Sequence, residues 1–190
     1  MIERVLLLTA FFLGVTACTT PPPSEYTISR DSLFYLQQLP PTKVTVGSVT
    51  GVTDENLEVS IPRSLLFCSA DFEDDLTIYA NTYIEVALIK ELVGAGLYSQ
   101  DIGAVRIAGI IEHLSISRRV PFKGEWKITL RLRSSNGAQL IVSEDYRFDV
   151  GSLAGKTVCR RAIENFEPAV QSLLERALRS NQFPALTVPS

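Results

Sequence analysis

Hydrophobic and polar residues change their spacing along the chain, and these changes predict where strands and helices lie. Residues 43–52 are rich in valine and threonine and follow a Pro-Pro pair, which indicates a first strand. Residues 77–93 place apolar side chains at helical spacing. Acidic residues before this segment and glycines after it suit the two ends of a helix. We therefore expect one strand followed by one helix.

Three β-rich segments follow the predicted helix. Residues 104–117 change the phase of their apolar positions, and Gly109 lies near the change, so we expect a β-bulge there. Residues 125–133 and 139–150 alternate apolar and polar side chains with a period of two. These two segments predict a pair of half-buried strands.

The turn between the last two strands contains Asn-Gly, which is a hairpin signal. A two-residue loop would place the charged face of one strand beside the apolar face of the other. A three-residue loop over 135–137 pairs Leu132 with Leu140 and leaves Gly137 in a left-handed conformation. We predict this second register, although it places Glu144 on the apolar face.

A second amphipathic helix is expected over residues 156–180, and Pro168 should kink it or restart it. The complete order is strand, helix, strand, strand, strand, helix. This order predicts an α+β fold, a two-layer sandwich in which a mostly antiparallel sheet of about four strands carries two helices on one face.

Two cysteines belong to this predicted domain, Cys68 just before the first helix and Cys159 near the start of the second. If chain direction alternates through the sheet, both helices begin at the same end of it. We therefore predict a Cys68–Cys159 disulfide, a bond that persists in exported proteins. Two buried free thiols are the alternative.

The amino terminus has the layout of an export signal. Residues 5–17 form an apolar run that is too short to span a bilayer and ends in Val-Thr-Ala before Cys18. This ending resembles the lipobox of bacterial lipoproteins, in which the cysteine receives diacylglycerol and further acyl chains such as palmitate. We expect lipid on Cys18, and an ordinary signal peptide cut nearby is the alternative.

A proline-rich stretch, Thr-Thr-Pro-Pro-Pro, follows Cys18 and is typical of a semi-rigid spacer. Thr19 occupies the place where enterobacterial lipoproteins retained in the inner membrane carry aspartate, so this resemblance implies the outer membrane, on its periplasmic face. We expect a signal peptide over 1–17, a lipidated tether over 18–40, one domain over 41–183 and a tail over 184–190.

Composition and candidate chemistry narrow the function without specifying it. The formal net charge is −3 and the pI about 5.3, and no basic stripe predicts nucleic-acid binding. His113 is the single histidine, and no set of residues has the spacing of a metal site. The acidic cluster over 71–75 lacks the spacing of an EF-hand loop. We therefore expect no cofactor, no metal and no catalytic residues.

The whole layout resembles the YajG-type bacterial lipoproteins. Lipobox, proline tether, strand, a helix ending in Glu-Leu-Val-Gly-Ala-Gly-Leu, three strands and an amphipathic helix carry this resemblance. The layout is also similar to the lipopolysaccharide-assembly lipoprotein LptE and to small lipoprotein activators of cell-wall synthases. The resemblance implies a non-catalytic protein of the cell envelope.

We expect a binding or assembly factor that is held on the membrane by Cys18 and contacts an unidentified envelope protein. The expected partner surface is the uncovered face of the sheet, represented by Lys127, Thr129, Arg131 and Arg133. One alternative is an accessory lipoprotein of an envelope lipid-transport system. Another is a small envelope hydrolase that relies on carboxylates.

Overall fold

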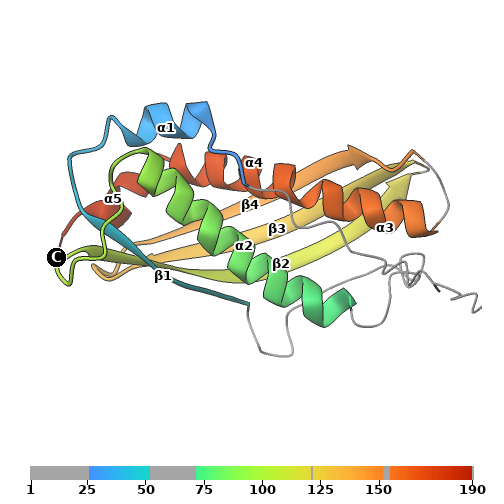
Figure 1. Cartoon of the computed structure of the whole chain (residues 1–190), viewed down its shortest axis with the longest axis horizontal. Coiled ribbons are helices and arrows are strands. Elements are labelled where there is room, and N and C mark those ends of the chain that lie inside the picture. Colours follow the sequence, from blue (N-terminus) through green and yellow to red (C-terminus); the bar gives the residue numbers. More distant parts are fainter. Residues whose placement is uncertain (1–25, 52–71, 121, 152–154, 190) are drawn as a thin grey trace, which may run out of the picture.

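The computed structural model describes residues 26–51, 72–120, 122–151 and 155–189 (Figure 1). At its centre is a sheet with the strand order β1-β2-β3-β4. β1 runs parallel to β2, and the other neighbouring strands are antiparallel. The sheet is therefore mostly antiparallel, as predicted. Its strands are β1 (Val44–Gly51), β2 (Val105–Val120), β3 (Lys123–Ser134) and β4 (Gln139–Asp149).

Helices cover one face of this sheet, which makes the fold the predicted two-layer α+β sandwich (Figure 1). The helix α2 (Phe72–Gly94) connects β1 to β2 and packs against β1, while α4 (Phe166–Leu178) packs against β4. A fully buried aliphatic side chain contributes about 1.5–3 kcal/mol, so the buried stripe of α2 stabilises this packing. The predicted stripe is buried throughout: Ala80, Tyr83, Ile84, Ala87, Leu88 and Leu92.

The β3–β4 hairpin has the predicted register. Leu132 pairs with Leu140, and Gly137 has a φ of 89°, in the left-handed region that glycine adopts without strain. Glu144 does lie on the buried face of β4, where Arg176 of α4 reaches it at 2.9 Å. An inward-pointing charge is a known protection of edge strands against pairing with other chains, so the apparent defect has a structural role.

A bulge in β2 lies three residues beyond the predicted place, and a second register shift follows between Ser117 and Val120. Ile111 pairs with Leu130 and His113 pairs with Thr129, so Glu112 is the extra residue. Gly109 has another role, because a Cβ atom there would lie 2.9 Å from Cγ2 of Val49. Gly109 thus allows β1 to approach β2 closely, and the phase change belongs to Glu112.

The carboxy-terminal helix restarts at the proline, one of the two predicted outcomes. The helix α3 (Gly155–Glu164) ends before Asn165, and Pro168 occupies the first turn of α4. In one continuous helix the ring of Pro168 would clash with the carbonyl group of Glu164 and leave it without a donor. Starting a new helix at Phe166 removes both penalties.

Two short helices lie in segments that we expected outside the domain. The helix α1 (Arg30–Leu36) lies in the expected tether, and α5 (Phe183–Thr187) extends into the expected tail. Tyr26, Leu36 and Leu186 are nevertheless buried in the core. The folded part therefore begins by Tyr26, not at residue 41, and extends beyond residue 183. Helices this short are stabilised by tertiary packing, which periodicity does not reveal.

Candidate functional site

The predicted partner surface lies on β3, on the sheet face that the helices leave uncovered. Lys127, Thr129 and Arg131 alternate with buried side chains of β3 and are half-buried, while Arg133 is exposed. The four side chains do share one face, as the period of two requires. Binding of a partner to these residues stays a prediction.

Ion pairs within the sheet already neutralise part of this surface. Nε of Arg131 donates to Glu112 at 2.6 Å, and the ammonium group of Lys127 lies 3.7 Å from Asp145. Thr129 and Ser143 share a hydrogen bond of 2.9 Å between their hydroxyl groups. This face is therefore polar and charge-balanced, which suits contact with water or with a polar partner.

A second site holds the amino-terminal segment on α2. The hydroxyl group of Tyr26 donates to Oε1 of Glu91 at 2.6 Å, and the backbone N–H of Ser29 donates to the same oxygen at 2.9 Å. Glu91 is completely buried. Buried carboxylates require such partners, and here both partners come from residues that precede α1. We call Tyr26, Ser29 and Glu91 the N-terminal latch.

The electrostatics of the latch follow from its burial. Loss of hydration raises the pKa of Glu91, and the hydrogen bonds from Ser29 and Tyr26 oppose that rise. Burial also raises the pKa of Tyr26, and the neighbouring Glu91 raises it further, so the phenol stays protonated and remains a donor. Since Glu91 has no exposed surface, the latch is a structural group and offers no access to a substrate.

Aromatic side chains extend the latch into the interior. The ring of Tyr26 meets that of Tyr83 edge-on at 6.2 Å, and Phe166 packs against both Tyr83 and Trp126. The indole N–H of Trp126 donates to the carbonyl group of Ala162 at 3.0 Å. The first described residue of the chain is thus continuous with the packing between α2, β3 and the carboxy-terminal helices.

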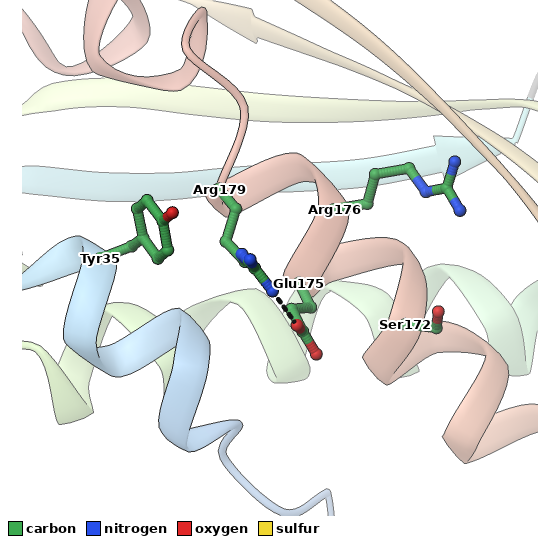
Figure 2. A pocket seen from close by; sticks show the side chains of 5 residues that line it. All are labelled: Tyr35, Ser172, Glu175, Arg176 and Arg179. Atoms are coloured by element: carbon green, nitrogen blue, oxygen red, sulfur yellow. Dashed lines mark hydrogen bonds and ion pairs between the residues drawn. The ribbon is translucent and has the colours of Figure 1, made fainter.

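Beside the latch, α1 and α4 enclose a shallow polar depression of about 440 Å³. Figure 2 shows Tyr35 of α1 facing Arg179, just past the end of α4, while Arg176 points away from them. The guanidinium group of Arg179 lies 5.1 Å from the centre of the Tyr35 ring and 2.7 Å from Glu175. The remaining lining residue is Ser172.

Large apolar side chains are also exposed on α1, just before it and at the end of α2. Phe34 is 65% exposed and Val93 55%, while Tyr35 and Ile28 are 41% and 36% exposed. The rings of Phe34 and Tyr35 meet edge-on at 6.3 Å. We call Ile28, Phe34, Tyr35 and Val93 the α1 surface. We did not predict this surface from the sequence. Its only indication in the sequence is the pair Phe34-Tyr35, which lies in the segment that we interpreted as a tether.

The predicted cysteine sites fall largely outside the described residues. Cys18 and Cys68 lie outside them, and of Cys159 only the backbone is described, in α3. The strand directions place the beginnings of α2 and α3 at the same end of the sheet (Figure 1). The lipid attachment and the Cys68–Cys159 disulfide stay predictions.

Membrane-spanning helices and metal-binding groups are considered for the described part of the chain only. There, no helix combines the length and the apolar character needed to cross a bilayer. Nor does a group of three or more His, Cys, Asp or Glu side chains occur with an arrangement that could hold a metal ion.

Comparisons with known proteins concern the fold. No family model matches the sequence, and no curated protein matches it significantly. The structure is similar to the crystal structure of protein XCC0632 from Xanthomonas campestris, a DUF330 protein. The TM-score is 0.45 and the sequence identity 8%, over 72% of this chain and 84% of that one. The class is therefore defined by the structure itself, a two-layer α+β sandwich.

Proposed function

We propose that this protein is a lipoprotein of the bacterial envelope, anchored through Cys18, whose domain is a non-catalytic binding or assembly factor facing the periplasm. The observation that carries the proposal is the sequence Val-Thr-Ala-Cys at the end of a short apolar run, followed by three prolines. Several acyl chains on one cysteine would hold the domain on a membrane essentially permanently.

The fold supports this proposal by the way it treats the amino-terminal segment. The described structure begins only eight positions after Cys18, and its first residue, Tyr26, is buried and hydrogen-bonded to Glu91. In a lipid-anchored domain, any force on the anchor reaches the domain through the chain between Cys18 and Tyr26. The latch transmits such a force to α2, which packs on the sheet.

A binding role is favoured over the hydrolase alternative by the chemistry of the carboxyl groups. A hydrolase of the expected kind needs a carboxyl group with a raised pKa in an accessible pocket. Within the described residues, the carboxyl group whose pKa is raised is that of Glu91, which substrate cannot reach. The exposed carboxylates Asp145 and Asp149 form ion pairs with neighbouring lysines on the open sheet face.

Metabolic labelling tests the anchor. Cells that express the full chain are fed a clickable palmitate analogue, and membranes are separated on a density gradient. The wild type should carry the label and follow outer-membrane markers, whereas Cys18→Ser should carry none. Cys159→Ser is the matched control, because it makes the same substitution at a cysteine outside the lipobox and should keep the label. Equal labelling of Cys18→Ser and the wild type would contradict the proposal.

Site-specific photocrosslinking tests the binding role. A photoreactive amino acid is placed at Arg133 on the open face of the sheet, or at Arg160 on an exposed position of α3 as the control. We expect one defined envelope protein to be captured from position 133 and not from position 160. Capture of the same mixture from both positions would count against a specific partner on the sheet.

A further inference from the structure

We propose that the α1 surface lies against the lipid bilayer that holds Cys18, so that Phe34 and Tyr35 enter the headgroup region and fix the orientation of the domain. This inference rests on the proposed lipid anchor and names the surface that contacts the membrane. The open face of the sheet points away from the helix layer (Figure 1) and would remain accessible to a protein partner.

The length of the connection limits which surface can reach the membrane. From Cys18 to Tyr26 the chain advances eight residues, which span at most roughly 28 Å even when fully extended. A compact domain of about 150 residues has a radius of gyration of roughly 15 Å and hence a diameter near 40 Å. The tether is shorter than the domain is wide, so the surface around Tyr26 stays close to the bilayer.

The α1 surface is the part of the molecule that adjoins this attachment point. Only three residues separate Tyr26 from Arg30, where α1 begins. The side chain of Ser29 caps α1 by accepting a hydrogen bond from the N–H of Ser32, and Gln171 of α4 donates to the carbonyl group of Thr27 at 3.1 Å. With the latch, these contacts make α1 a rigid extension of the domain.

The exposed side chains of this surface match the chemistry of a membrane interface. Phe34 directs its ring outward, and Tyr35 combines an apolar ring with a polar hydroxyl group, a combination that is enriched where lipid headgroups meet water. Ile28 adjoins the end of α2, since a Cβ atom on Gly94 would lie 3.1 Å from its Cδ1 atom. Ile28, Phe34 and Tyr35 all follow the attachment point at Tyr26 within nine residues, which makes this exposed apolar segment a candidate interaction surface.

Charged groups at the border of the α1 surface are compatible with a lipid occupant. Arg30 and Arg179 are exposed beside α1 and the end of α4, and long cationic side chains can reach anionic headgroups while their stems stay apolar. Asp31 and Glu175 both pair with Arg179, so the local charge is small. We therefore expect the aromatic rings to supply most of the membrane contact and the arginines a smaller, salt-dependent part.

Tryptophan fluorescence in the lipidated full-length protein tests this orientation. Phe34→Trp places a reporter on the α1 surface, and Ile141→Trp places a matched reporter at a residue of similar exposure on the open face of the sheet. The native Trp126 is completely buried and contributes the same background to both variants. Each variant is reconstituted in vesicles of phosphatidylethanolamine and phosphatidylglycerol, with or without brominated acyl chains, which quench only tryptophans that touch lipid.

We expect brominated lipid to reduce the added fluorescence at position 34 by about half or more and to leave that at position 141 nearly unchanged, because only the former lies in the interface. Tyr35→Trp is a second reporter on the same surface and should behave like Phe34→Trp. Circular dichroism of each variant verifies the fold. Equal quenching at positions 34 and 141, or stronger quenching at 141, would overturn the proposed orientation.

Flotation of the same vesicles separates this inference from the anchor on which it rests. Protein that floats with the vesicles but shows no preferential quenching at position 34 keeps the anchor and refutes the α1 contact. Protein that does not float refutes the lipid anchor itself. The Cys18→Ser chain, mixed with the same vesicles, should lose most of the flotation and of the quenching.

Discussion

Removing one hydroxyl group from the latch should weaken the attachment of the amino-terminal segment by a calculable amount. In Tyr26→Phe the buried ring is kept, so hydrophobic burial and the contact with Tyr83 should change little. The change deletes the 2.6 Å hydrogen bond to Glu91, which keeps its hydrogen bond from the N–H of Ser29. Hydrogen bonds to charged groups contribute about 1.5–3 kcal/mol when they are buried.

The decrease in the free energy of unfolding caused by Tyr26→Phe should depend on pH. The hydrogen bond from Tyr26 lowers the pKa of Glu91, which means that it stabilises the ionised carboxylate more than the neutral acid. The difference in the free energy of unfolding between wild type and Tyr26→Phe should therefore be largest at neutral pH. It should shrink as the pH falls and Glu91 takes up a proton.

Urea unfolding of the detergent-solubilised full-length protein, followed by circular dichroism at pH 7 and pH 4.5, measures both effects. A loss of about 2 kcal/mol corresponds to a fall in Tm of roughly 4–8 °C for a chain of this size. Amide hydrogen exchange should accelerate most in α1. Tyr98→Phe is the control, because Tyr98 is only partly buried and its hydroxyl group accepts just one exposed hydrogen bond. If both variants lose the same small amount, the latch is not what holds the segment.

Three further substitutions test other contacts of the fold. Glu91→Gln should gain stability relative to wild type as the pH rises. Burial raises the pKa of Glu91, so the contribution of this group to the stability of the wild type is complete below the ordinary carboxyl pKa of about 4.3 and is lost as the pH rises through the folded pKa. Titration of the unfolding free energy of both proteins against pH measures this difference, and parallel curves would contradict it. Arg176→Met should lower the free energy of unfolding in urea by about 1–3 kcal/mol, because it leaves Glu144 buried without its cation. Arg160→Met, which removes an exposed ion pair on α3, is the control and should lower the free energy of unfolding by less than about 0.5 kcal/mol. Asn136→Ala should release α5, since the Asn136 amide donates to the carbonyl groups of Ala185 and Val188 at 2.8 and 2.7 Å. Hydrogen exchange should become faster at residues 183–188 and at Ala138, whose N–H loses its bond to Oδ1 of Asn136. Unchanged exchange at 183–188 would refute the role of this amide.

The cysteine pair is tested by chemistry instead of stability. Mass spectrometry of a non-reduced digest of the exported protein should recover one peptide pair that contains Cys68 and Cys159. Two alkylatable thiols would refute the disulfide. The shared end of the sheet at which α2 and α3 begin is the structural feature consistent with this bond (Figure 1).

The hairpin shows how far local pattern can determine a structure. The alternation along β3 and β4 has a period of two, so a slip of one residue would place Lys127 and Arg131 in the core. Of the two loop lengths considered, only the three-residue loop avoids that penalty, and the structure has it. The same pattern could not locate the bulge in β2, because it shows that the phase changes but not which residue is extra. Pairing with Leu130 and Thr129 decides that Glu112 is the extra one.

The short helices α1 and α5 were not predicted from the sequence, and the reason is physical. The segment of α1 has seven residues and no helical stripe long enough to recognise, and an isolated helix of that length is unstable in water. Tyr26 and Leu36 become core residues only because α2 and α4 supply the surfaces on which they pack. The latch likewise joins residues 62 and 65 positions apart in the chain.

The sequence by itself determined the two-layer class, the register of the hairpin and an interruption of the carboxy-terminal helix at Pro168, because each follows from local sterics or from a strict repeat of apolar positions; the structure decided that this interruption is a restart. It also supplied the prediction of an anchor at Cys18. Tertiary structure alone decided that a buried Glu91 holds the amino-terminal segment, and that Phe34 and Tyr35 stand exposed beside it. Those features depend on surfaces that meet only after the chain has folded, since burial and exposure are properties of the assembled layers.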